Sequence, residues 1–387
     1  ITSINSQSQQ VVVVSVSGDK PELGNSQLIP RRDFKVDGVC LYRDEAHNEF
    51  VFLVGEEGLG EQWLVAQSEK LLAEPKLVRA LSLPPESEHC QVDDSLALLY
   101  VNEEGVGFWA YEAHPEAALV RYPVDMIKPF GSIADNAVGM VQLPGGLLAL
   151  DAGSGELHAY QAEGGKWQSV WQRPLNNLDE PEWISARIAN NKTEIIVRDE
   201  KGMHQSTLDW VPAVKKAADT LPILTVHTQT DPVPSLGDAA DDPAIWVHPK
   251  NPAQSLVLGT DKRGGLAVYD LQGKEKQYLA AGRLNNVDVR TDFTWNGKKV
   301  DVAVATHRDH NSLQVFSIDR NTGLLTDIGQ VATPLTDIYG ICMYKDAAGA
   351  IYAIPNDKDG RFLQYRLSAV SEKIHGEMVR EFSVKTQ

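Results

Sequence analysis

A long internal repeat constrains the fold of this chain more than any other feature of its sequence. Residues 37–65 align without a gap with residues 339–367, at an offset of 340 − 38 = 302. The match extends backwards, where residues 11–23 lie over 313–325. It also extends forwards, with a small shift, to a short apolar segment near residue 80 and its counterpart near residue 380. A match of this length indicates that the two regions share one fold.

A shorter unit recurs within the long repeat. Each unit reads as an apolar alternating strand, a polar turn, a second strand of small or β-branched residues, another turn, and a third strand that ends near Tyr or Trp. The units start near Gly38, Gln91, Gly139, Ile184, Ala244 and Val289, and the series returns at Gly340. Units of about 40–50 residues with this pattern are typical of the four-stranded blades of a β-propeller. The sequence therefore predicts an all-β, six-bladed β-propeller.

The chain of 387 residues holds more than one ring of such blades. We expect residues 1–213 to form degenerate propeller blades, the later blades of a first ring. Residues 214–222 are expected to be a linker, with a short helix over 210–222 as its main helical candidate. Residues 223–387 are expected to be the first blades of a second propeller that is C-terminally incomplete. Alternatively, both segments close into one permuted ring, because closure removes exposed sheet edges.

Composition excludes two classes of partner. The chain has 36 Lys and Arg against 53 Asp and Glu, a formal net charge of −17, which argues against a track for nucleic-acid phosphates. No stretch approaches the roughly 18 consecutive apolar residues of a membrane span. The chain starts at Ile1 without a signal sequence, so either a leader has been removed or the chain is a fragment. We expect a secreted or periplasmic bacterial protein; the oligomeric state stays open.

The cysteines and two tryptophans are predicted to be structural. Cys40, Cys90 and Cys342 are odd in number and scattered, which predicts neither a disulfide framework nor a zinc site. Cys40 and Cys342 occupy equivalent strand positions and are expected to be small core residues. Trp63 and Trp246 are likewise expected in the core.

A pair of carboxylates, Asp241 and Asp242, stands directly before a strand-like segment in DDPAIWVHPKNP, residues 241–252. Taken alone, the pair reads as a solvated turn. Together with four further motifs, however, this segment resembles the β-propeller phytases in order and spacing: GTDKRGGLAVYDLQGKE (259–275), GRLNNVDVRTDF (282–293), VDVAVATHRDHNSLQVF (300–316) and DIYGICMY (337–344). The resemblance covers residues 225–387 closely and residues 10–213 weakly.

The resemblance implies a calcium-dependent phosphatase that acts on phytate, myo-inositol hexakisphosphate, or on lower inositol phosphates. Calcium takes oxygen ligands, and cations must neutralise so dense a polyanion. The implied Ca²⁺ ligands are Asp241, Asp242, Asn286 and Asp288, with Glu88, Glu104 and Asp179 as acidic matches in the first segment. The implied phosphate-binding and catalytic residues are Lys262, Arg308, Tyr339 and Lys358.

The first segment departs from the family pattern at several of these positions. At the offset of 302, Asp37 corresponds to Tyr339 and Glu56 corresponds to Lys358. Val138 stands where the family has a Glu. An acid that faces a phosphate is unfavourable, so the first segment is expected to have kept the fold and part of the acid set, without the phosphate grip.

Two other functions compete with a phytase. One is a non-catalytic propeller that binds calcium and polyphosphates or glycans. The other is a different calcium-dependent propeller hydrolase, such as a lactonase or phosphotriesterase, although neutral substrates need no cluster of Lys and Arg. The sequence contains neither a G-x-S-x-G elbow nor a P-loop. It does not reveal which phosphate would be cleaved first.

Overall fold

The structure is a computed structural model that describes residues 1–17, 22–214 and 226–385. These residues form antiparallel strands β1 to β30 and a three-residue 3-10 helix, Pro252–Gln254. Among the described residues, no helix has the length and apolar composition that a membrane crossing requires. The all-β prediction is confirmed. The chain divides into two compact units, Ile1–Leu224 (unit 1) and Thr225–Gln387 (unit 2).

Unit 1 contains eighteen strands among its described residues. They are β1 (Thr2–Asn5), β2 (Gln10–Ser17), β3 (Glu22–Leu28), β4 (Gly38–Arg43), β5 (Glu49–Gly55), β6 (Leu59–Gln67), β7 (Lys70–Ser82), β8 (Cys90–Asp93), β9 (Leu98–Glu103), β10 (Gly107–Glu112), β11 (Tyr122–Met126), β12 (Ala137–Leu143), β13 (Gly146–Asp151), β14 (Glu156–Glu163), β15 (Lys166–Pro174), β16 (Trp183–Ala189), β17 (Lys192–Asp199) and β18 (Gly202–Leu208).

Unit 2 contains twelve strands among its described residues. They are β19 (Ala240–Trp246), β20 (Leu256–Asp261), β21 (Gly265–Tyr269), β22 (Glu275–Leu279), β23 (Leu284–Trp295), β24 (Lys298–His307), β25 (Ser312–Ile318), β26 (Leu325–Ala332), β27 (Ile338–Lys345), β28 (Ile351–Asp357), β29 (Arg361–Val370) and β30 (Lys373–Ser383).

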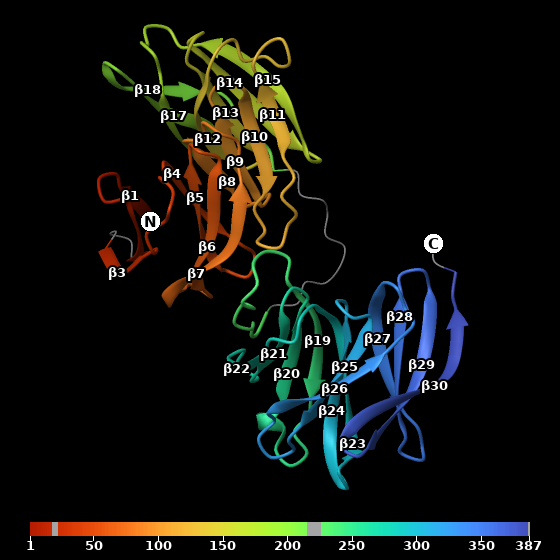
Figure 1. The fold of residues 1–387 in the computed structure, drawn as a ribbon. Helices are drawn as coiled ribbons and strands as arrows, with labels where there is room; N and C mark the ends of the chain where they lie inside the picture. The colour runs from red at the N-terminus through yellow and green to blue at the C-terminus, as the bar shows by residue number, and fades with distance from the viewer. Residues whose placement is uncertain (18–21, 215–225, 386–387) are drawn as a thin grey trace. The chain divides into compact units, whose positions relative to one another are not determined.

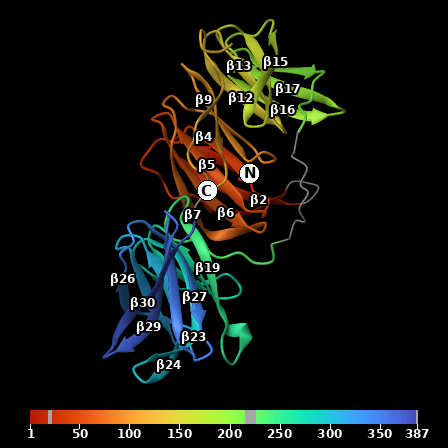
Figure 2. The ribbon, with the colours of Figure 1, turned by 90° about the vertical axis from the view of Figure 1, so that its right-hand side faces the viewer.

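Consecutive strands pair into meander sheets (Figures 1 and 2). Unit 2 has three four-stranded sheets, β19–β22, β23–β26 and β27–β30. Unit 1 has three four-stranded sheets, β4–β7, β8–β11 and β12–β15, together with the three-stranded sheets β1–β3 and β16–β18. Each predicted unit start lies in the first strand of a sheet, in β4, β8, β12, β16, β19, β23 and β27. The number of blades in a ring, its closure and the assignment of each unit to a ring stay predictions.

The internal repeat reappears as matched strands. Strand β28 starts at residue 351 and β5 at residue 49, so their difference is 351 − 49 = 302; for β25 and β2 it is 312 − 10 = 302. Strands β1–β3 therefore correspond to β24–β26, the last three strands of a four-stranded sheet. The two copies share both the strand pattern and its register along the chain.

The sheets pack face against face, with their first strands side by side. Strand β19 contacts β23, which contacts β27, and in unit 1 the contacts run from β4 to β8, β12 and β16. Strand β24 is buried on both faces, since Val302, Ala303, Val304 and Ala305 are all fully buried. A strand covered on both sides needs a continuous apolar run of small and β-branched residues, which explains the sequence of the second strands.

Two further structural predictions concern the buried tryptophans and the segment between the units. Trp63 and Trp246 are buried as predicted, and the Trp246 indole nitrogen donates to Asp301 at 2.9 Å. The helix predicted over 210–222 falls largely outside the described residues; its first part, residues 210–214, is not helical. The linker 214–222 lies outside them almost entirely.

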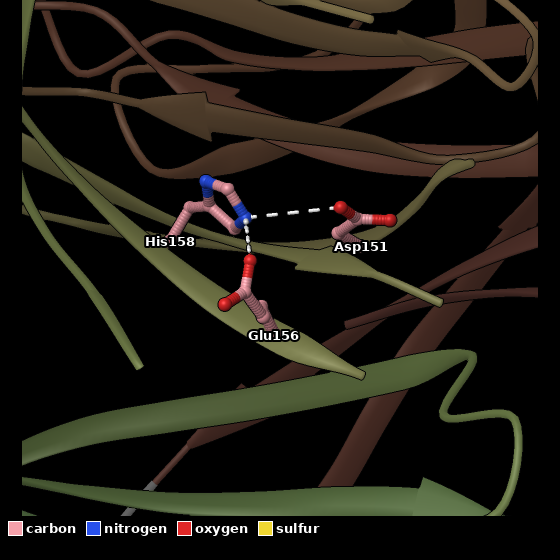
Figure 3. Close-up of side chains that lie close together, drawn as sticks. All are labelled: Asp151, Glu156 and His158. Atoms are coloured by element: carbon pink, nitrogen blue, oxygen red, sulfur yellow. Dashed lines mark ion pairs between the residues drawn. The ribbon is translucent and has the colours of Figure 1, made fainter. Parts of the chain in front are cut away.

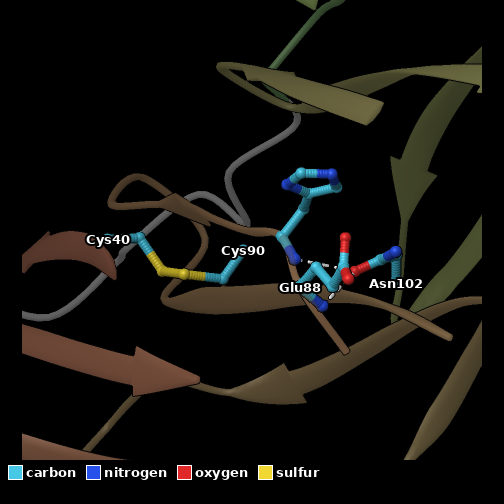
Figure 4. The surroundings of a disulfide bond; sticks show 5 residues. Cys40, Glu88, Cys90 and Asn102 are labelled. Atoms are coloured by element: carbon cyan, nitrogen blue, oxygen red, sulfur yellow. Dashed lines mark hydrogen bonds between the residues drawn. A yellow bond between two sulfur atoms is a disulfide. The ribbon is translucent and has the colours of Figure 1, made fainter. Parts of the chain in front are cut away.

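The predictions of no disulfide and of a core position for Cys342 are wrong, whereas Cys40 is buried in the core as predicted. Cys40 and Cys90 form a disulfide between β4 and β8, with their Cα atoms 5.9 Å apart (Figure 4). Cys342 is exposed rather than buried in the core. The two bonded cysteines are 50 residues apart in sequence, so only the face-to-face packing of neighbouring sheets brings them together. The spacing of Cys40 and Cys90 in the sequence therefore could not predict the disulfide.

Candidate functional site

One edge of each sheet in unit 2 carries a β-bulge at the start of its first strand. The register shifts between Ala240 and Pro243 in β19, between Leu284 and Val287 in β23, and between Ile338 and Ile341 in β27. Bulges release residues from the ladder and re-aim their side chains. The released positions hold four of the predicted site residues: Asp241, Asp242, Asn286 and Tyr339.

The three predicted cations stand at the same edge. Lys262, Arg308 and Lys358 each follow directly after the last residue of the second strand of their sheet, β20, β24 and β28. In an antiparallel pair, the end of the second strand lies beside the start of the first. The backbone repeats this arrangement, because the N–H of Lys262 donates to Ala239 at 2.8 Å and that of Arg308 donates to Arg283 at 2.8 Å.

Two buried threonines tie the three bulges together. The Thr260 hydroxyl accepts from the N–H of Asp242 at 2.9 Å and donates to the carbonyl of Asn285 in the next sheet at 2.6 Å. Thr306 repeats the pattern, accepting from the N–H of Asn286 at 3.1 Å and donating to the carbonyl of Tyr339 at 2.6 Å. We call these contacts the hydroxyl latch. Sequence reasoning missed both residues, although each stands one position before the end of its second strand.

Electrostatics connect the residues of the first two bulges. The Lys262 ammonium lies 2.7 Å from Asp238 and 3.8 Å from Asp241. The hydrogen bond to Asp238 raises the pKa of Lys262 against the effect of burial, and Asp241 and Tyr339 add to the increase. Burial raises the pKa of Asp241, and the charge of Asp242 adds to this, while Lys262 and Arg308 counteract it.

The third sheet joins this group through Tyr339. The Lys358 ammonium lies 5.2 Å from the centroid of the Tyr339 ring and 3.1 Å from the Asp337 carboxylate. The structure thus brings Asp241, Asp242, Lys262, Arg308, Tyr339 and Lys358 to one edge of unit 2. Lys262 and Lys358 each form an ion pair with an acidic neighbour, which a bound phosphate would have to displace.

The remaining predicted metal ligands of unit 2 are engaged in hydrogen bonds. The Asp288 carboxylate accepts from Arg290 at 2.7 Å and from the N–H of Met343 at 2.7 Å. The Asn286 amide oxygen accepts from Asn285 at 2.6 Å, and Asp242 accepts from the N–H of Val287 at 2.9 Å. The bonds from Met343 to Asp288 and from Val287 to Asp242 connect the first strands of neighbouring sheets, whereas the other two lie within β23. A calcium role for Asp288 and Asn286 stays a prediction.

Unit 1 carries different side chains at the corresponding edge, and of its first strands β4, β8, β12 and β16 only β12 has a bulge like those of unit 2. Glu88 immediately precedes the β8 region and Glu104 directly follows β9. Asn102 takes the place of the latch threonine, accepting from the N–H of Glu88 at 3.1 Å and donating to the carbonyl of Ala137 at 3.2 Å (Figure 4). Burial raises the pKa of Glu88, as do the charges of Asp37, Glu104 and Glu56. The edge of unit 1 is therefore acidic.

Asp179 lies before the sheet β16–β18. Its carboxylate is 3.0 Å from the Lys201 ammonium, and its N–H donates to Asp199 at 3.0 Å. Its described contacts are with that sheet rather than with Glu88 or Glu104. The calcium roles predicted for all three acids of unit 1 stay predictions.

Comparison with known proteins gives a family and a relative. The family model described as Phytase matches residues 8–165 and 192–387. A curated relative, the 3-phytase of Bacillus subtilis (strain 168), is 43% identical over 172 residues, which is 42% of this chain and 45% of the relative. The match thus spans less than half the length of that relative.

Solved structures give weaker likenesses. A functionally unknown protein from Desulfotomaculum acetoxidans DSM 771 has a TM-score of 0.36 and 10% identity over 100% of this chain and 99% of its own. Saccharomyces cerevisiae Sqt1 has a TM-score of 0.33 and 10% identity over 91% of this chain and 96% of its own.

Proposed function

Because the chain belongs to the β-propeller phytase family, we propose that it hydrolyses phosphomonoesters of phytate or lower inositol phosphates in a calcium-dependent reaction. The proposed site is the bulged edge of unit 2. The observation that carries this proposal is positional: Lys262, Arg308 and Lys358 occupy equivalent places in three successive sheets, beside bulges that hold two carboxylates and a tyrosine. A substrate with several phosphates fits a row of separated cations.

The chain's own side chains would bind and orient the phosphates. Arg308 can donate two parallel hydrogen bonds to one phosphate, whereas Lys262 and Lys358 act as point charges. Fixed cations also stabilise the charge that develops on the transferred phosphoryl group. Tyr339, 44% exposed and beside Lys358, would add a hydroxyl donor at the same edge.

The donor set fits calcium at the first bulge. Ca²⁺ prefers carboxylate and carbonyl oxygens, and Asp241 and Asp242 are adjacent acids whose proximity helps raise the pKa of Asp241. Such crowding favours a bound cation. When bound, calcium would supply positive charge and activate water for attack on phosphorus. Asn286 and Asp288 are proposed as further ligands, and Glu88, Glu104 and Asp179 as weaker ones in unit 1.

Export is part of the proposal, either secretion or transfer to the periplasm of a bacterium. The disulfide between Cys40 and Cys90 supports it, because disulfides persist mainly in oxidising compartments.

The test is phosphate release from phytate by the whole chain, with calcium and with a chelator. Arg308→Ala should lower release by about 10²–10³-fold, the loss typical of removing one transition-state donor. Lys298→Ala is the matched control, because Lys298 is an exposed cation at the opposite end of the same strand, β24. Equal activity of the two variants would contradict the assigned site.

The second candidate is a propeller that binds polyphosphate without cleaving it. The acidic edge of unit 1, where no phosphate grip is expected, supports this candidate, because similar meander sheets there carry charges of the opposite sign. Phytate binding by calorimetry, with no phosphate release at any calcium concentration, would select the binder over the enzyme.

A further inference from the structure

Unit 1 contains a largely buried cluster of two carboxylates and one histidine, none of which is among the predicted site residues (Figure 3). Asp151 ends β13 and pairs across the hairpin with Glu156, and His158 follows on the same face of β14. The Nε2 atom of His158 lies 3.9 Å from an Asp151 oxygen and 3.8 Å from a Glu156 oxygen. The side chains of His158 and Asp151 are fully buried, while that of Glu156 is 33% exposed.

The hydrogen bonds behind His158 determine which ring nitrogen carries its proton. Ser132 donates its single hydroxyl proton to Asp125, which also accepts from Tyr160 at 2.6 Å. The Ser132 oxygen can therefore only accept from His158, whose Nδ1 lies 3.4 Å away. This contact favours a proton on Nδ1, which leaves a lone pair on Nε2 directed towards the two carboxylates.

A buried lone pair that faces two carboxylates is unfavourable unless a cation lies between them. Nε2 of His158 has no hydrogen-bond partner among the described residues. An unsatisfied buried polar atom of this kind calls for an explanation, and a metal ion supplies one.

We propose that Asp151, Glu156 and His158 bind a divalent transition-metal ion of the Zn²⁺ class. Imidazole nitrogen is a ligand for zinc and its neighbours, whereas calcium takes oxygen ligands. Tetrahedral zinc with bonds of about 2.1 Å places its ligand atoms about 3.4 Å apart, so the cluster needs only to close slightly around the ion. The partly exposed Glu156 provides the entry path. Ser132 is a positioning residue that fixes the ring of His158.

The neighbouring sheet shows the same framework without the site. Asp199 ends β17 as Asp151 ends β13, and His204 takes the place of His158. The Nε2 atom of His204 lies 2.9 Å from Asp199, and Gly202 stands where Glu156 would be. Asp151 and Asp199 both accept backbone N–H groups, so the acid at the end of the second strand has a structural role in both sheets. The additional Glu and the unsatisfied nitrogen distinguish the proposed site.

The experiment is calorimetric titration of the metal-free whole chain with Zn²⁺. One saturable site is expected, with affinity lowered at least about tenfold by Glu156→Gln or His158→Gln and about 10–100-fold by Ser132→Ala. His204→Gln should bind as the unchanged chain does, which controls for adventitious binding to a histidine. If His158→Gln does not fold, Glu156→Gln still decides, because that side chain is partly exposed.

Three results would overturn the proposal: no saturable binding by the unchanged chain, an affinity in both Glu156→Gln and Ser132→Ala that equals that of the unchanged chain, or displacement of zinc by a hundredfold excess of Ca²⁺. None of them bears on phosphate release at the edge of unit 2. The site and the proposed function can therefore fail separately.

Discussion

The two units place ion pairs of opposite polarity at equivalent positions. In unit 2 the Lys358 ammonium lies 3.1 Å from the Asp337 carboxylate. In unit 1 the Glu56 carboxylate lies 3.4 Å from the Lys35 ammonium, and 358 − 56 and 337 − 35 both equal 302. Asp37, the counterpart of Tyr339, forms a second ion pair with Lys35, at 2.7 Å. The Lys35 ammonium of unit 1 is thus paired with two acids of the same edge, Glu56 and Asp37.

The sheet architecture beneath these side chains is shared, apart from the bulges at the starts of most first strands. Both units have meander sheets whose first strands are adjacent, and both connect neighbouring sheets through a polar residue near the end of a second strand, Thr306 in one and Asn102 in the other. The comparison teaches that the scaffold and the chemistry of the edge vary independently. The contacts between neighbouring sheets persist in unit 1, where the charges of the edge side chains are reversed. These charges can therefore change without loss of the fold.

Loss of the disulfide should have the largest effect on stability, and it should be confined to unit 1. The bond closes a 50-residue separation, and a loop of that size contributes about 4 kcal/mol to the free energy of unfolding. Cys40→Ala with Cys90→Ala should therefore increase hydrogen exchange throughout the cores of β4–β11. Exchange in unit 2 should stay unchanged, and Cys342→Ala is the control. Equal loss of protection in both units would show that their stabilities are coupled.

Reversal of the ion pair in unit 2 should weaken phytate binding, because it removes one cation from the phosphate-binding position while keeping the ion pair itself. Lys358→Glu with Asp337→Lys gives the edge of unit 2 the polarity of unit 1, and it leaves the net charge unchanged. Phytate affinity, measured by calorimetry, should fall about a hundredfold, or about 2.7 kcal/mol. The exposed pair itself contributes at most about 1 kcal/mol to folding, so the variant should fold.

The reverse exchange in unit 1 is the control for that experiment. Lys35→Asp with Glu56→Lys creates the polarity of unit 2 in an edge that still holds Glu88 and Glu104. Phytate affinity should remain as in the unchanged chain. A fall of similar size in both variants would mean that overall surface charge, rather than the edge of unit 2, determines binding.

The hydroxyl latch should contribute to stability in unit 2 without contributing charge. Thr306→Val keeps the shape of the side chain but leaves the N–H of Asn286 and the carbonyl of Tyr339 without their partner. Leaving such groups unpaired should cost about 2 kcal/mol in the free energy of unfolding, measured in urea. Thr326→Val is a matched control, since Thr326 is an exposed strand residue of the same sheet. Equal effects of both substitutions would mean that the hydroxyl latch does not stabilise unit 2.

Sequence periodicity was enough to predict the strands, because the second strands of several sheets, such as β5, β13 and β24, are buried on both faces and must be apolar. The family resemblance, rather than periodicity, grouped Lys262, Arg308 and Lys358 as phosphate-binding residues, and the structure places each directly after the second strand of its sheet. Periodicity could not predict contacts between sheets. The disulfide of Cys40 with Cys90, the latch of Thr306 and the pairing of Asp288 with Met343 all depend on how one sheet packs against the next. Those distances are not encoded in the spacing of any one motif.

The acidity of the edge in unit 1 should give the smallest effect on stability, with a size that depends on pH. Burial raises the pKa of Glu88 above its ordinary 4.5, and the charges of Asp37, Glu104 and Glu56 add to this. The folded state therefore binds the proton more tightly than the unfolded state does. Stability decreases as pH rises from about the ordinary pKa through the raised one, and the full penalty is present at pH 7.

Glu88→Gln removes that penalty and should stabilise the chain at pH 7 by less than about 0.5 kcal/mol, because solvent screens an exposed carboxylate. At pH 4, where Glu88 is already protonated in the folded state, the variant and the unchanged chain should unfold at the same urea concentration. Glu381→Gln provides the opposite sign, since the hydrogen bond from Arg361 lowers the pKa of Glu381 and stabilises its ionised form. If Glu88→Gln destabilised the chain at pH 7, the Glu88 carboxylate would have a favourable partner at this edge, such as a bound cation. The contrast between the two units would then depend on whether a cation is bound there, and not on the charges of the side chains alone.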